Sequence, residues 1–194
     1  MKLDKKINYI VSGLERSGTS MLMQILNAGG APTGFDDSRR ADVNNPKGYF
    51  ELEGGKIINK LMDGTFPLDR FKGQFIKITS FGLKYLPFGS YKIIYSERNI
   101  EEILDSMEKM ADIKDIERDK TRESFIKLNA MIKNYITNRE DIEILMVNYN
   151  DIIADPANNI KRVYEFINNS DLNLENMINA VDKKLYRQRR KNTN

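Results

Sequence analysis

The chain has 194 residues, of which 40% are hydrophobic and 30% charged, and its net charge is +3. This composition suits one globular domain over residues 1–194, and so small a charge does not by itself indicate nucleic-acid binding. The chain contains no cysteine and no histidine. Disulfides and thiolate chemistry are therefore excluded, and any acid–base step must use carboxylate, lysine or tyrosine side chains.

The hydropathy of the chain and its first residues bear on where the protein is located. The first apolar run ends at Val11 and continues into a glycine loop, without the cleavage site of a secretory signal. No stretch approaches the ~20 apolar residues of a membrane span, so we expect a cytoplasmic protein.

The last twelve residues carry six basic and no acidic side chains. Such a run is usually a solvated chain end, and alternatively it closes over a polyanionic ligand.

Strand and helix patterns alternate along the chain. Short apolar runs predict strands at 7–11, 74–78, 91–95 and 142–147. Apolar residues at helical spacing predict helices at 21–28, 51–62, 99–110, 121–138, 155–167 and 173–181. Asn99 and Glu102 form a possible capping box. This alternation predicts an α/β fold, a three-layer sandwich with a mostly parallel central sheet of the P-loop NTPase-like kind, whose ligands bind at the carboxyl ends of the strands.

The first strand and helix are joined by a loop with phosphate-binding spacing. Residues 11–20 read V-S-G-L-E-R-S-G-T-S, in which Gly13 and Gly18 have the spacing of a P-loop. A nucleotide triphosphatase would continue with Lys and Ser/Thr, whereas here Thr19 follows Gly18. Backbone N–H groups at a helix N-terminus still bind anions. The loop predicts a phosphate-bearing ligand other than ATP·Mg²⁺; the alternative is an ordinary strand–helix turn.

Further polar residues lie at or near the ends of the other strands. Arg98 follows the third strand, and Ser106 lies eight residues on in the next helix. Together they offer a planar fork of donors and a hydroxyl to one phosphate, although, taken alone, they fit a surface charge and a tolerated helical serine better. Lys77 lies in an otherwise apolar strand, and exposure at the strand end is its simplest explanation.

These motifs resemble those of one enzyme family. The loop at 12–20 is similar to the 5′-phosphosulfate loop of the P-loop sulfotransferases that use 3′-phosphoadenosine-5′-phosphosulfate (PAPS), and residues 91–107 resemble their 3′-phosphate segment. Further similarities lie at 45–51 and 185–189, to a short bacterial-type branch, and at 147–152, to the family's Tyr-Glu-Asp-Leu segment. The match spans about residues 7–189 and implies the sulfotransferase fold.

The resemblance implies a role for each matching residue. The loop residues Glu15, Arg16, Ser17, Gly18, Thr19 and Ser20 would bind the 5′-phosphosulfate, with Arg16 stabilising charge on the departing oxygen. Arg98 and Ser106 would bind the 3′-phosphate, and Arg187 and Arg189 in the basic tail would fold over it. Lys77 matches a lysine of the cytosolic members, and Thr79 occupies the place of their histidine base.

The implied reaction is transfer of the sulfuryl group from PAPS to an acceptor hydroxyl or amine, with no metal, because Arg16 and Lys77 supply positive charge. Glu51 is the first candidate for the missing base, although it equally fits a carboxylate at a helix start, and Glu15 is the second. A small-molecule or carbohydrate acceptor is expected, bound by residues 31–50 and 82–90, while lipid and peptide stay open. The oligomeric state is not specified.

Two other functions compete with this one. A P-loop kinase or nucleotide hydrolase is disfavoured by Thr19 and by the lack of an aspartate-ended apolar strand to hold Mg²⁺. A sulfotransferase-like protein that binds a nucleotide without turnover is the stronger alternative, because the chain is short and lacks histidine.

Overall fold

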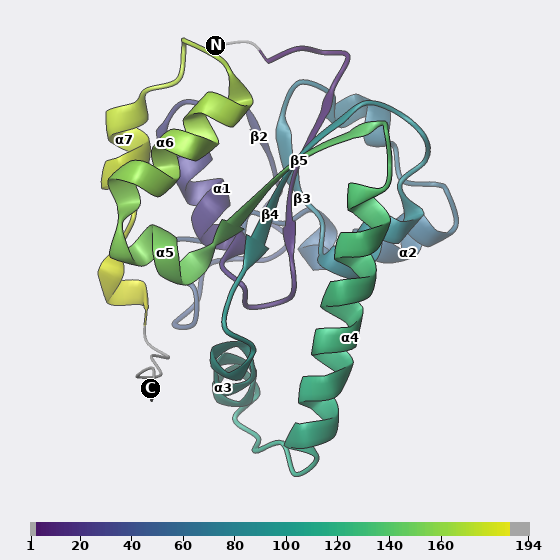
Figure 1. Ribbon diagram of the computed structural model, residues 1–194, viewed down its shortest axis with the longest axis vertical. Coiled ribbons are helices and arrows are strands. Elements are labelled where there is room, and N and C mark those ends of the chain that lie inside the picture. Colours follow the sequence, from purple (N-terminus) through teal and green to yellow (C-terminus); the bar gives the residue numbers. More distant parts are fainter. Residues whose placement is uncertain (1–2, 187–194) are drawn as a thin grey trace.

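A computed structural model describes residues 3–186 and contains one five-stranded sheet (Figure 1). Its strands are β1 (Asn8–Gly13), β2 (Thr33–Gly34), β3 (Phe75–Lys77), β4 (Tyr91–Glu97) and β5 (Ile142–Asn148). The order is β2-β3-β1-β4-β5, and every pairing in the sheet is parallel. Ile10 in the central strand lies opposite Ile76 in β3 and Ile93 in β4.

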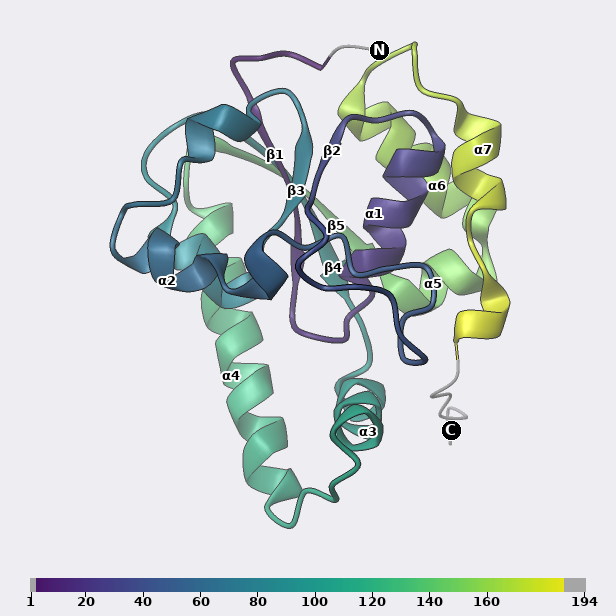
Figure 2. The same ribbon diagram turned by 180° about the vertical axis from the view of Figure 1, so that it is seen from behind.

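Helices cover both faces of the sheet. They are α1 (Thr19–Ala28), α2 (Ile57–Met62), α3 (Ile100–Ala111), α4 (Arg118–Thr137), α5 (Tyr149–Ala154), α6 (Pro156–Ile167) and α7 (Leu174–Asn179). Figures 1 and 2 show α1, α5, α6 and α7 on one face and α2 and α4 on the other. The predicted three-layer α/β fold is confirmed. Within residues 3–186, no helix is long and apolar enough to cross a membrane.

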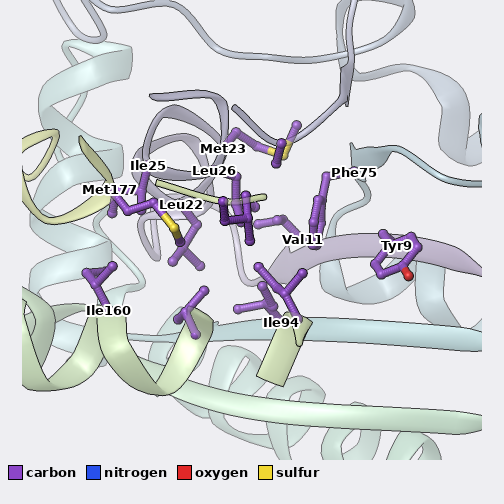
Figure 3. Packing of buried hydrophobic residues seen from close by; sticks show 14 of the residues in the cluster. Tyr9, Val11, Leu22, Met23, Ile25, Leu26, Phe75, Ile94, Ile160 and Met177 are labelled. Atoms are coloured by element: carbon purple, nitrogen blue, oxygen red, sulfur yellow. The ribbon is translucent and has the colours of Figure 1, made fainter. Parts of the chain in front are cut away.

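Two apolar cores hold the central strand from both sides. Successive side chains of a strand point to opposite faces, so Val11 packs with Leu22 of α1 and Met177 of α7 (Figure 3). Ile10 packs on the other face in the cluster that includes Ile132 of α4. Each of these side chains is fully buried, which contributes about 1.5–3 kcal/mol apiece. This packing fixes the strand that carries the glycine loop.

Many of the residues predicted for the site lie where three neighbouring strands end. Because β3, β1 and β4 are parallel, their carboxyl ends meet at one edge of the sheet. In Figure 1 this edge faces down, and α3 and the N-terminal half of α4 extend beyond it. Arg118 of α4 joins these two helices through ion pairs with Glu101, Asp105 and Glu108 of α3, at 2.6–2.9 Å.

The predicted helix over 51–62 is wrong in its first half. A 3₁₀ turn occupies Glu53–Gly55, and α2 begins only at Ile57. Gly54 and Gly55 have φ of 63° and 84°, which interrupts a right-handed helix. Two short elements, β2 and α5, lay outside the predicted set. The Asn99 cap is confirmed, since its side chain accepts from the Glu101 N–H.

Candidate active site

The loop between β1 and α1 closes tightly around two glycines. The Ser17 N–H donates to the Leu14 carbonyl at 3.1 Å, which turns the chain. Gly18 has φ of 104°, and a Cβ there would lie 2.3 Å from Cδ2 of Tyr149. Gly13 has φ of 150°, and a Cβ there would lie 2.5 Å from the Ser96 carbonyl oxygen. Both positions therefore require glycine, for backbone conformation and for space.

The loop presents unpaired donors at the N-terminus of α1. Within residues 3–186, no side chain caps the first turn of this helix, and that turn contains no acidic residue. The Ser17 hydroxyl is fully buried and has no hydrogen-bond partner among these residues. Backbone N–H groups at a helix N-terminus and the helix dipole both favour a negative charge. A phosphate or phosphosulfate group fits this site.

Arg16 connects the loop to the segment after β4. Its Nε donates to Oγ of Ser106 at 3.0 Å, and its carbonyl oxygen accepts from Nη1 of Arg98 at 3.1 Å. Ser96, the last β4 residue but one, donates from Oγ to the Ser17 carbonyl at 2.7 Å. These bonds place the residues predicted to bind the 5′-phosphosulfate beside those predicted to bind the 3′-phosphate.

The Arg98 guanidinium forms an ion pair with a buried carboxylate, that of Glu102. Glu102 is 1% exposed and accepts from Nε of Arg98 and from Nδ2 of Asn150, both at 3.1 Å. The Tyr186 hydroxyl also donates to Glu102. Burial and this bond raise the pKa of Tyr186 to about 12, so the hydroxyl remains a donor. Arg98 lies over the Tyr149 ring, 4.5 Å from its centroid.

Lys77 meets the loop from the neighbouring strand. Its Nζ is 2.7 Å from Oε1 of Glu51, 2.7 Å from the Tyr49 carbonyl oxygen and 3.2 Å from Oγ of Ser20. The Lys77 side chain is 6% exposed and that of Glu51 is 11% exposed. Strand-end exposure therefore does not explain this lysine. Its ammonium group lies at the start of α1, where the P-loop lysine of nucleotide triphosphatases contacts the phosphates.

The ion pair sets the charge states of both groups. Burial lowers the pKa of Lys77, and the nearby Glu51 carboxylate opposes this only in part. Burial acts to raise the pKa of Glu51, but Lys77 and Arg39 outweigh it and leave that pKa below its ordinary value. We therefore treat Glu51 as ionised at neutral pH.

A folded loop covers this pair on its far side. Nη1 of Arg39 donates to Oε2 of Glu51 at 2.9 Å, and its guanidinium carbon lies 3.6 Å from the Tyr49 ring centroid. The Tyr49 hydroxyl donates to the Asp42 carboxylate, 2.8 and 2.9 Å from its two oxygens. Polar contacts centred on Tyr49 thus order the segment at residues 31–50, which the sequence assigns to the acceptor.

One cavity of about 300 Å³ brings the predicted residues together. Its lining includes Glu15, Arg16, Gly18, Thr19, Ser20, Glu51, Lys77, Arg98 and Ser106. Ser17 is buried instead, and Arg187 and Arg189 lie outside the described residues.

The sequence prediction missed Arg39, Lys109 and Tyr149, which also line the cavity. For Tyr149, the segment at 147–152 was the available signal. For Lys109, it was its position three residues after Ser106, one helical turn further on. For Arg39, it was its place within residues 31–50, the segment expected to bind the acceptor.

A parallel sheet whose central strand feeds a glycine loop and a helix N-terminus defines a P-loop-type α/β protein. The family follows from the sequence: the family model described as "Sulfotransferase domain" matches residues 6–194, and the chain belongs to the sulfotransferase family. This supports sulfuryl transfer as its general activity.

Solved structures agree on the fold. The sulfotransferase domain of the olefin synthase of Synechococcus PCC 7002 superposes with a TM-score of 0.56 and 14% identity, covering 93% of this chain and 78% of that one. Sulfotransferase STF1 of Mycobacterium tuberculosis H37Rv gives 0.55 and 13%, covering 90% and 71%. No curated protein sequence matches the chain.

Proposed function

We propose that this chain transfers a sulfuryl group from PAPS to an acceptor hydroxyl or amine. One observation carries the proposal: Arg16, hydrogen-bonded to Ser106 and Arg98, joins a lysine-free glycine loop to a second anion-binding segment. A donor with phosphates at both the 5′ and the 3′ position needs two adjacent anion sites. ATP has no 3′-phosphate and would leave the second site unused.

The donor would lie across the edge of the sheet. The 5′-phosphosulfate is assigned to the N-terminus of α1, where Gly18, Thr19 and Ser20 line the cavity and the buried Ser17 precedes them. Arg98 and Ser106 are assigned to the 3′-phosphate, and Arg187 and Arg189 of the basic tail are proposed to add positive charge there.

The acceptor oxygen or nitrogen would attack sulfur as the bond from sulfur to the phosphate oxygen breaks. Adenosine 3′,5′-bisphosphate leaves with that electron pair, and the negative charge grows on the departing oxygen. Arg16 and Lys77 are the cations beside the loop, and such preorganised charge is usually the largest catalytic contribution. The proposed chemistry therefore assigns charge stabilisation to these two side chains and to no metal.

The attacking hydroxyl must also lose its proton. Glu51 is the proposed acceptor of this proton, because it is ionised, lines the cavity and touches Lys77. A carboxylate with a lowered pKa is a weak base until one of its cations is compensated. Glu15, exposed at the same cavity, is the second candidate. The ion pairs of Glu51 also suit the alternative of a nucleotide-binding protein without turnover.

Calorimetric titration tests the donor assignment. Wild-type protein should bind adenosine 3′,5′-bisphosphate in preference to adenosine 5′-monophosphate and to ATP·Mg²⁺. Arg98→Ala should weaken bisphosphate binding at least tenfold, since a charge-assisted hydrogen bond is lost. Because that variant leaves Glu102 buried beside a gap, Ser106→Ala serves as the milder second variant.

Selectivity for the bisphosphate that falls in both variants supports the proposal. A preference for ATP·Mg²⁺ would contradict it and favour a kinase. Incubation with labelled PAPS then separates an enzyme from a binding protein, because only the enzyme passes label to an acceptor.

A further inference from the structure

Arg39 lies in the wall between two cavities. It lines the cavity beside the glycine loop, and it also lines a second hollow formed by residues 35–37, 39–41 and 47–50, which we call the loop hollow. Tyr49 is the other residue common to both. A molecule bound in the loop hollow would therefore contact the residue that touches Glu51.

Arg39 is held in place while much of it stays accessible. Glu51 accepts from one of its N–H groups, and the Tyr49 ring supports its flat face. A guanidinium has five N–H donors in a planar fork. The Arg39 side chain is 38% exposed, against 6% for Lys77. Its geometry is thus fixed by two contacts, with donors left to bind a further group.

The charges around the loop hollow favour an anion. Arg39, Arg40 and Lys47 line it together with Asp36 and Asp37, so the basic side chains outnumber the acidic ones by one. Asp36 already accepts from the Glu53 N–H at 2.7 Å and from the Ser38 N–H at 2.9 Å. A carboxylate, sulfate or phosphate group matches the planar fork of an arginine.

We propose that Arg39 recognises the acceptor: it binds an anionic group of the acceptor in the loop hollow and thereby directs a hydroxyl of the same molecule to Glu51. This inference rests on the proposed function and names its substrate class, a polar hydroxyl compound that bears a carboxylate, sulfate or phosphate. The hydroxyl oxygen bonds to sulfur, its proton passes to Glu51, and the bisphosphate leaves with the electrons of the broken sulfur–oxygen bond.

The bound anion would also prepare the base. Arg39 is one of the two cations that hold the pKa of Glu51 down. An anion on Arg39 offsets that positive charge, so the pKa of Glu51 rises when the acceptor binds. Glu51 then takes up a proton more readily in the complex than in the free protein. Acceptor binding thus weakens the effect of Arg39 on Glu51 and makes Glu51 a stronger base.

Nuclear magnetic resonance tests the contact without turnover. The Nε–H signal of Arg39, assigned by its loss in Arg39→Lys, is followed in protein saturated with adenosine 3′,5′-bisphosphate. Methyl glucuronide and glucose 6-phosphate are the anionic probes, and methyl glucoside is the neutral match. We expect one or both anionic probes to shift the signal at tens of millimolar, and the glucoside to leave it unchanged.

Variants separate binding from folding. In the variants, probe binding is followed by the backbone amide signals of residues 47–50, which line the loop hollow. Arg39→Gln should weaken binding of the probe that shifts Arg39 at least tenfold, Arg39→Lys should weaken it less, and Arg162→Gln on the exposed face of α6 should match wild type. Nε–H shifts that are equal for all three sugars, or absent with both anionic probes, would overturn the inference. If the bisphosphate itself shifts no backbone signal of the glycine loop, the proposed function fails and this inference fails with it.

Discussion

The ammonium group of Lys77 and the carboxylate of Glu51 lie 2.7 Å apart, in a place where both side chains are almost completely shielded from water. Lys77 ends β3, and Glu51 belongs to the loop segment that precedes α2. The contact therefore joins the sheet edge to the segment that we assign to the acceptor. Removing either partner leaves the other charge buried with fewer contacts.

The first prediction concerns the stability of this pair. Glu51→Gln should lower the free energy of unfolding by about 3 kcal/mol, because Lys77 stays buried without its carboxylate partner. Lys77→Met should lower it by less, because Glu51 keeps its ion pair with Arg39. The double variant should lose less than the sum, since neither member of the buried pair remains charged. Urea unfolding of the four proteins measures this coupling. Strict additivity would show that the two charges do not depend on each other.

The second prediction concerns alkaline pH. Burial lowers the pKa of Lys77 below 10.5, and a lysine loses its charge as the pH rises through its pKa. As the pH rises, the sulfuryl-transfer rate should therefore begin to fall before pH 10.5 is reached. The pKa of Glu51 is lowered, so the rate should not fall just below neutral pH. Lys77→Arg should retain activity to higher pH, because arginine stays charged. If the rate of that variant falls at the same alkaline pH as wild type, the charge of Lys77 does not contribute to the reaction.

The third prediction separates backbone strain from crowding. Gly18 and Gly30 both have positive φ, 104° and 87°, but a Cβ on Gly18 meets the Tyr149 ring, whereas one on Gly30 meets nothing within 4 Å. Gly30→Ala should cost about 1 kcal/mol from strain alone, and Gly18→Ala about 3 kcal/mol or more. Thermal unfolding compares them. Equal losses would mean that the Tyr149 ring moves aside freely.

The fourth prediction assigns the Tyr49 loop to the acceptor. Tyr49→Phe removes the hydroxyl that binds Asp42 and should cost about 1 kcal/mol of stability. We expect a higher KM for the acceptor and unchanged affinity for adenosine 3′,5′-bisphosphate. Tyr164→Phe on α6 is the matched control and should change neither value. Weaker bisphosphate binding in Tyr49→Phe would place the loop on the donor side instead.

The parts of the fold that could be predicted are those encoded by neighbouring residues. Val11, Gly13 and Gly18 lie within one short stretch, so strand, turn and helix follow directly from the sequence. The cap of α6 is equally local, because Asp155 stands beside Pro156 and its side chain accepts from the Asn158 N–H. The alternation of such units then indicates a parallel sheet.

The parts that could not be predicted depend on contacts between distant segments. Glu102 matches a capping box by spacing, yet its carboxylate binds Asn150 and Tyr186 from two distant segments, besides the nearby Arg98. Nothing near Gly18 in sequence reveals that the Tyr149 ring packs against it. The spacing of residues in the sequence identifies candidates for the site, whereas the tertiary structure determines which of them are in contact.

The order of the strands has a consequence for engineering. The residues assigned to the nucleotide follow β1 and β4, whereas Lys77, Glu51 and the loop hollow lie on the side of β3 and β2. The two sets meet at the start of α1, where Nζ of Lys77 is 3.2 Å from Oγ of Ser20 and the Ser20 hydroxyl donates to the Tyr49 carbonyl. The segment from residue 31 to residue 62 therefore crosses no strand that carries a proposed nucleotide ligand. Grafting that segment from another member of the family should exchange the acceptor while the donor stays the same.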